Sequence, residues 1–260
     1  MWRVDQVVVD GVRLEAGWWQ PAEPAAGGAP LVLLHEGLGS VSTWRDFPAR
    51  LAARTGRGVF AYSRRGHGRA EPRGTGLAMR FMHDEAAVLP RVLDAAGITR
   101  AVLVGHSDGG SIALLAAAAI PDRVAALVVE APHVFVEERS IASIRAIRDR
   151  YAGDAQLRAR LAAHHRHVDE MFYGWNDVWL GDDFRAWTIG DEIRRVTCPV
   201  LALQGLEDEY GTPAHVQAIQ RLAAGPVTLS LIQKCGHSPH RDHPEIVLDR
   251  VAAFIAQPHG

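Results

Sequence analysis

The chain has 260 residues, of which 48% are hydrophobic and 22% charged, and its formal net charge at pH 7 is −2. These values suit one globular domain with an insertion and argue against nucleic-acid binding, since the arginines are spread among acidic residues. They also argue against a membrane protein, because no apolar run approaches the ~20 residues of a membrane helix. The first residues lack the basic-then-apolar layout of a signal peptide, so we expect a cytoplasmic location.

The first half of the chain alternates predicted strands with predicted helices. Residues 6–10 and 12–19 are expected to form a hairpin at the antiparallel edge of a sheet, because Asp10-Gly11 favours positive φ. A Pro- and Gly-rich loop over 21–30 follows. Four apolar runs of the kind buried on both faces of a parallel sheet come next: 31–34, 59–62, 101–104 and 124–130. Helical sequence lies between them, to about 55, over 77–96 and to near 121.

The alternation stops between about residues 132 and 196. This stretch has no strand signal, and aromatic residues cluster in its second half, so we predict a helical cap inserted into a single domain, 1–260. Strands at 200–203 and 227–232 then resume, each followed by helical sequence. Such repeated βα units predict an α/β fold with a mostly parallel sheet, helices on both faces, and a functional site at the carboxyl ends of the strands.

A serine between two glycines lies at the end of one predicted strand. Gly105-His106-Ser107-Asp108-Gly109 follows the apolar run 101–104 and precedes an Ala- and Leu-rich helical stretch. In this strand–turn–helix context, Gly-x-Ser-x-Gly is typical of a nucleophile elbow, which holds a serine in a strained, exposed conformation. The same five residues could also form a glycine-rich turn with an incidental serine, so the later strand ends must distinguish the two.

Two later strand ends carry the partners that a serine nucleophile needs. A serine hydroxyl is activated by a base, usually a histidine oriented by a carboxylate. Acidic residues follow the strand 200–203, and histidines follow the strand 227–232. The order serine, acid, histidine is the one expected for an elbow serine on this architecture. Three matches at strand ends, in the right order, therefore favour a catalytic triad.

These motifs resemble the α/β-hydrolase family over nearly the whole chain. The resemblance implies that Ser107 is the nucleophile and that Asp208, in the family's acid loop, is the acid, with Glu207 and Glu209 as adjacent alternatives. It also implies that His237, in the Gly-His loop, is the general base. The implied fold is the α/β-hydrolase fold with a cap, and the implied chemistry needs no cofactor and no metal.

The resemblance further implies an oxyanion hole made of two backbone amides. One is the N–H of Asp108, directly after the nucleophile. The other lies in the loop after the third strand, where alignment on His35 and Trp44 makes Gly37 the donor and Leu38 the fallback. The segment that begins at Ser63 matches a conserved family loop, for which we expect a structural role.

Two acidic residues flank the expected oxyanion hole. Glu36 stands where the family carries glycine, and we expect a carboxylate held beside the site, with a solvent-facing side chain as the alternative. The Gly-x-Ser-Asp-Gly-Gly form resembles valacyclovirase and other biphenyl-hydrolase-like esterases, in which the carboxylate equivalent to Asp108 favours substrates with an α-amino group. Equally, Asp108 could bond to backbone N–H groups or to an arginine behind the elbow. In the cap, Trp175 and Trp179 are possible substrate contacts.

The sequence therefore predicts a serine hydrolase that cleaves a small carboxylic ester, thioester or lactone through an acyl-enzyme. A C–C bond hydrolase of the meta-cleavage type uses the same triad, and a cavity arginine placed for a substrate carboxylate would favour it. A non-catalytic ligand-binding protein on this fold is the third alternative. The partner is a small acyl substrate, with neither nucleic acid nor membrane. Histidines also cluster at 164–167 and 237–243, but no cysteine or carboxylate set completes a metal site.

Overall fold

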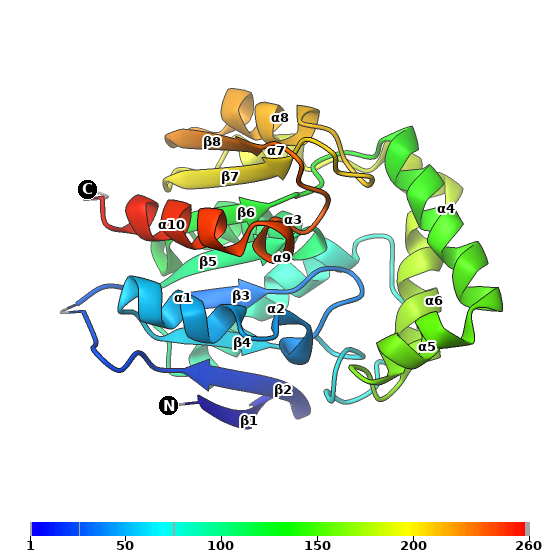
Figure 1. Cartoon of the computed structure of the whole chain (residues 1–260), viewed down its shortest axis with the longest axis horizontal. Helices are drawn as coiled ribbons and strands as arrows, with labels where there is room; N and C mark the ends of the chain where they lie inside the picture. Colours follow the sequence, from blue (N-terminus) through cyan, green and yellow to red (C-terminus); the bar gives the residue numbers. More distant parts are fainter. Residues whose placement is uncertain (1, 26, 75, 258–260) are drawn as a thin grey trace.

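An eight-stranded sheet, in the order β1-β2-β4-β3-β5-β6-β7-β8, forms the centre of the computed structural model, which describes residues 2–25, 27–74 and 76–257 (Figure 1). The hairpin of β1 (Trp2–Val9) and β2 (Val12–Trp19) occupies one edge and pairs antiparallel, as predicted. Asp10 and Gly11 make its turn with φ of 51° and 79°. Every pairing beyond β4 in the sheet order is parallel.

The central strands are buried on both faces. This explains why their sequences are short, continuously apolar runs rather than alternating ones. Two strands extend two residues beyond the predicted apolar runs. The bounds of these strands are β3 (Leu31–Leu34), β4 (Val59–Tyr62), β5 (Ala101–His106), β6 (Val124–Glu130) and β7 (Val200–Gly205). The edge strand, β8 (Val227–Ile232), is only partly buried.

Helices cover both faces of the sheet, which confirms the predicted α/β fold class. One face carries η1 (Val41–Trp44), α1 (Phe47–Thr55), α9 (Pro239–Asp242) and α10 (Pro244–Ile255). The other carries α2 (Phe81–Ala95), α3 (Asp108–Ala119), α7 (Gly190–Ile193) and α8 (Ala214–Leu222). A short turn, η2 (Pro121–Arg123), connects α3 to β6.

One helix boundary differs from the prediction. The helix expected over 77–96 runs only from Phe81 to Ala95, and the buried side chains of this stretch also begin at Phe81. Among the described helices, none combines the length and the apolar character that a bilayer crossing would require.

The insertion stands beyond the carboxyl ends of the parallel strands (Figure 1). It consists of α4 (Glu138–Gly153), α5 (Ala155–Ala162), α6 (Val168–Trp179) and η3 (Asp182–Ala186). Its helices enclose a small core of their own, which includes Tyr151 stacked on Phe172. The predicted range 132–196 is wider than this projecting part, since α7 packs against α3 and α8 in the body of the domain.

Candidate active site

Ser107 lies in a sharp turn between β5 and α3. Its φ of 54° and ψ of −120° fall outside the regions that a side-chain-bearing residue prefers, which is the strain expected of a nucleophile elbow. Only glycine fits at the two flanking positions, because there is no room for a Cβ atom. A Cβ at Gly105 would overlap the carbonyl oxygen of Gly109, and one at Gly109 would overlap the carbonyl oxygen of Leu34. The turn therefore presents the hydroxyl to the cavity at the carboxyl end of the central strand.

The three residues of the predicted triad meet at this edge of the sheet. Ser107 Oγ lies 2.9 Å from His237 Nε2, and His237 Nδ1 lies 2.9 Å from each carboxylate oxygen of Asp208. Ser107, His237 and Asp208 follow β5, β8 and β7, which are parallel strands of one sheet, so the carboxyl ends of the strands bring the three side chains to the same edge. His237 contacts Asp208 rather than either exposed neighbour, Glu207 or Glu209. The arrangement can transfer a proton from the serine to the imidazole.

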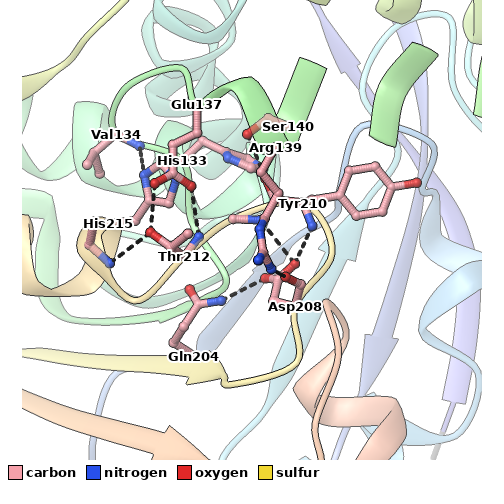
Figure 2. Close-up of polar contacts among 12 residues, drawn as sticks. His133, Val134, Glu137, Arg139, Ser140, Gln204, Asp208, Tyr210, Thr212 and His215 are labelled. Carbon is pink, nitrogen blue, oxygen red and sulfur yellow. Dashed lines mark hydrogen bonds and ion pairs between the residues drawn. The ribbon is translucent and has the colours of Figure 1, made fainter. Parts of the chain in front are cut away.

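Further hydrogen bonds hold the Asp208 carboxylate in its ionised form (Figure 2). It accepts from Gln204 Nε2 at 2.7 Å, from the Tyr210 amide at 2.7 Å and from the Gly211 amide at 3.2 Å. Burial alone would raise the pKa of Asp208. The hydrogen bond and the charge of His237, together with the other donors, outweigh it and lower the pKa to about 2. Asp208 is therefore an anion at neutral pH and can stabilise an imidazolium.

The expected oxyanion donors lie beside the serine. Within the described part of the chain, the backbone N–H groups of Gly37, Leu38 and Asp108 donate to no protein acceptor. Gly37 lines the same cavity as Ser107, and a Cβ at Gly37 would overlap Nε1 of Trp175. Free amides next to a nucleophile are the donors that a developing oxyanion requires.

The segment after β4 braces this loop. Arg64 donates through Nη1 to the carbonyl of His35 at 2.6 Å and through Nη2 to that of Glu36 at 3.0 Å. His67 Nε2 lies 3.0 Å from the Gly37 carbonyl. Since the carbonyls are held, the orientation of the intervening amides is also restricted. This bracing is the structural role expected for the segment.

The side chain of Asp108 is sequestered from the cavity. It is only 1% exposed, and its Oδ2 accepts from Trp175 Nε1 at 3.0 Å. Burial raises the pKa of Asp108 to about 6, although the charge of Arg64 opposes the shift. The cap indole covers the carboxylate, and a contact between Asp108 and a substrate amino group, one of two alternatives for this side chain, stays a prediction. Arg64 acts on the same carboxylate through its charge.

Glu36 faces the cavity and links two loops of the site. Its Oε1 lies 3.2 Å from Arg241 Nη2, and its Oε2 lies 3.6 Å from His106 Nδ1. His106 Nε2 lies 2.7 Å from the His237 carbonyl. Burial opposes ionisation of Glu36, but His106 and Arg241 hold its pKa well below the ordinary value. Sequence reasoning missed His106, because it occupies the variable position of the Gly-x-Ser motif.

A cavity of about 520 Å³ lies over Ser107, between the cap and the sheet. Trp175 lines it, together with apolar side chains of the cap. Trp179 does not, which corrects its expected role: it is fully buried and packs against His133 and Phe184, with ring centroids 4.9 and 4.8 Å away. Three arginines line the cavity: Arg45, Arg160 and Arg241.

Histidines of the two predicted clusters, 164–167 and 237–243, form hydrogen bonds with protein groups. His165 contacts the Leu38 carbonyl at 3.0 Å and accepts from the Gly68 amide at 2.9 Å, and His240 pairs with Glu130 at 2.9 Å. Among the described residues, no group of three or more His, Cys, Asp or Glu side chains is arranged to hold a metal ion.

The chain is similar in sequence and structure to known hydrolases and to a haloperoxidase. Residues 31–250 match the model of the alpha/beta hydrolase family. The chain is 28% identical to the non-heme chloroperoxidase of Streptomyces lividans over 275 residues, covering 95% of this chain and 97% of that protein. It is 27% identical to the serine hydrolase BPHL of Homo sapiens over 243 residues, covering 90% and 80%. The structure of Est816, described as an N-acyl homoserine lactone degrading enzyme, aligns with a TM-score of 0.75, at 25% identity over 96% of this chain and 100% of Est816.

Proposed function

The chain belongs to the alpha/beta hydrolase family, and we propose that it is a cofactor-independent serine hydrolase of small carboxylic esters, thioesters or lactones. One observation carries this proposal. Ser107 Oγ lies within hydrogen-bond distance of His237, whose other ring nitrogen contacts the ionised Asp208, and the serine lines a cavity. That combination is the requirement for nucleophilic acyl transfer. Relatives named as a serine hydrolase and a lactone-degrading enzyme support the substrate range.

The proposed reaction proceeds through an acyl-enzyme. Ser107 Oγ attacks the substrate carbonyl while His237 Nε2 takes its proton, and Asp208 stabilises the imidazolium. The amides of Gly37 and Asp108 hold the oxyanion. His237 then gives the proton to the leaving oxygen or sulfur as the old acyl bond breaks. Water attacks the acyl-enzyme by the same route, which releases the acid and returns the proton to Ser107.

A C–C bond hydrolase of the meta-cleavage type is the second candidate, and a specific observation favours it. The cavity that holds Ser107 is lined by Arg45 and Arg160, and among the described residues neither has an ion-pair partner. Arg241 also lines the cavity but is paired with Glu36. Guanidinium groups that line the same cavity as the nucleophile and have no ion-pair partner among the described residues suit a substrate that carries a carboxylate.

A substitution of the nucleophile tests the main proposal. Ser107→Ala should lower turnover of a p-nitrophenyl ester by about 10⁴-fold or more and abolish labelling by a fluorophosphonate probe, because no hydroxyl remains to attack. Circular dichroism should show an unchanged fold. Ser42→Ala, which removes an exposed serine hydroxyl, is the matched control and should be labelled normally. Undiminished turnover or labelling in Ser107→Ala would overturn the mechanism.

A further inference from the structure

The loop that carries Asp208 is attached to the first cap helix along its length (Figure 2). Three side chains near the start of α4 donate hydrogen bonds to three consecutive loop carbonyls. The bonds run from Arg139 Nη1 to Asp208 O at 2.7 Å, from Ser143 Oγ to Glu209 O at 2.6 Å, and from Ser140 Oγ to Tyr210 O at 2.6 Å.

The spacing of these donors follows from helix geometry. Residues three and four positions apart lie on the same side of a helix, so 139, 140 and 143 share one face of α4. Ser140 is fully buried, and its hydroxyl has a loop carbonyl as its acceptor. Helix interiors seldom favour serine on propensity alone, so two serines on the face that meets the acid loop indicate a specific contact.

A fourth contact fastens the far end of the same loop. Glu137, directly before α4, accepts from the Thr212 amide at 2.8 Å and from the Thr212 hydroxyl at 2.6 Å. Its Oε2 also lies 3.2 Å from Nε2 of the buried His215 (Figure 2). Residues 137–143, at the start of the cap, therefore form hydrogen bonds with the loop from residue 208 to residue 212.

The orientation of the acid depends on this loop backbone. Asp208 Oδ1 accepts from the amides of Tyr210 and Gly211, and the same oxygen contacts His237 Nδ1. A shift of the Tyr210 peptide would therefore change the hydrogen bonds that aim the carboxylate at the imidazole. Since the α4 donors fix the peptides at 208, 209 and 210, they constrain the carboxylate indirectly.

We propose that Arg139, Ser140 and Ser143 are positioning residues for the catalytic acid, so that the cap supports the triad as well as covering it. This inference rests on the proposed function, because it assigns the three residues to the step in which Asp208 stabilises the imidazolium. The proposed contacts link the position of the cap to catalysis. A displacement of α4 would change the orientation of the Asp208 carboxylate even when Ser107 and His237 stay in place.

The test combines these residues with the acid itself. The triple variant Arg139→Gln, Ser140→Ala, Ser143→Ala should lower kcat/KM for a p-nitrophenyl ester by about tenfold, far less than the ~10⁴-fold loss when a triad acid is replaced by its amide. The loss should fall on kcat rather than KM. The acid limb of the pH–rate profile should move to lower pH, because a poorly aimed carboxylate stabilises the imidazolium less.

A double-mutant cycle separates positioning from general destabilisation. In an Asp208→Asn background, the triple substitution should cause no further loss, since the carboxylate through which it acts is already absent. Arg139→Gln alone changes only an exposed side chain and keeps the test available if the triple variant folds poorly. Ser140→Thr, which retains the hydroxyl, should keep wild-type kcat. Arg145→Gln, an exposed residue of the same helix with no contact to the loop, is the control.

The possible failures are distinguishable. An Asp208→Asn variant with full activity would overturn the proposed function itself. If Asp208→Asn is impaired while the triple variant and Arg139→Gln keep the wild-type kcat and pH profile, the positioning role is wrong. Fully additive losses in the Asp208→Asn background would also overturn it, because the three residues would then act by another route.

Discussion

Asp108 carries one of the two expected oxyanion donors and Glu36 directly precedes the other, Gly37, but the two carboxylates have different surroundings. Asp108 is buried under Trp175, where burial raises its pKa to about 6. Glu36 reaches the cavity, where Arg241 and His106 keep it ionised. A free carboxylate would oppose negative charge on a substrate oxygen. Shielding one carboxylate and pairing the other limits that effect.

Asp108→Asn is expected to remove a contribution to stability that decreases as pH rises between about 4 and 6. Burial raises the native pKa of Asp108 from its ordinary value of 3.8 to about 6, so in this window the native state binds more protons than the unfolded state. The contribution of Asp108 to the free energy of unfolding is therefore favourable at low pH and is lost as pH rises through the window.

Urea unfolding of both proteins at several pH values between about 4 and 7 measures this effect. The asparagine side chain of the variant keeps an oxygen that can accept from Trp175 but cannot titrate, so the variant lacks the Asp108 contribution to the slope. Identical slopes in the two proteins would show that Asp108 does not titrate in this window.

The turn between β5 and α3 has no room for a side chain at position 105. We expect Gly105→Ala to destabilise the protein by about 1–3 kcal/mol or more, because its Cβ would overlap a backbone oxygen that cannot rotate away. Activity should fall with it, since the turn that presents Ser107 must shift. Thermal or urea unfolding gives the loss of stability.

Gly153→Ala is the matched control for that substitution. Gly153 is the last residue of α4, and nothing lies within 4 Å of a Cβ built there. Alanine should be neutral or stabilise the helix by up to about 1 kcal/mol. A Gly105→Ala protein as stable as Gly153→Ala would contradict the steric argument.

The elements that the sequence predicts well are those with local signals. The apolar strands, the Asp10-Gly11 turn and the elbow glycines are each defined by a few neighbouring residues, so their positions and the order of the triad could be inferred. The partners of the acidic residues could not. Trp175 meets Asp108 across 67 positions, and Arg241 meets Glu36 across 205. The hydrogen bonds between α4 and the loop that carries Asp208 also join residues far apart in the sequence. A helical pattern does not reveal what the polar face of the helix will contact.

At the scale of the whole molecule, the body and the cap both contribute positive charge to the cavity. Arg45 follows η1 in the body, and Arg160 belongs to α5 in the cap. A second hollow, lined also by Arg69 and Arg166, shares Arg45 and His164 with this cavity. Guanidinium groups therefore line both hollows, and they attract anions over a range limited by salt.

We expect p-nitrophenyl monoesters of short dicarboxylic acids to be cleaved with a higher kcat/KM than neutral esters of equal length, by several-fold at low ionic strength. Added salt should reduce the preference, and Arg160→Gln should lower it while Arg145→Gln leaves it unchanged. Paired kinetics with the two esters measure the ratio. A preference for the neutral ester would remove the support that these arginines give to carboxylate-bearing substrates, including the C–C cleavage candidate.

The position of β8 at the sheet edge also bears on how the chain is made. The ribosome completes Ser107 and its elbow long before His237, which comes 130 positions later, after the last strand. If the proposed mechanism holds, the hydroxyl lacks its base until the segment after β8 is in place, and the nascent protein is inactive by this route. On that mechanism, catalytic activity would begin only late in biosynthesis, after the last strand of the sheet has been made.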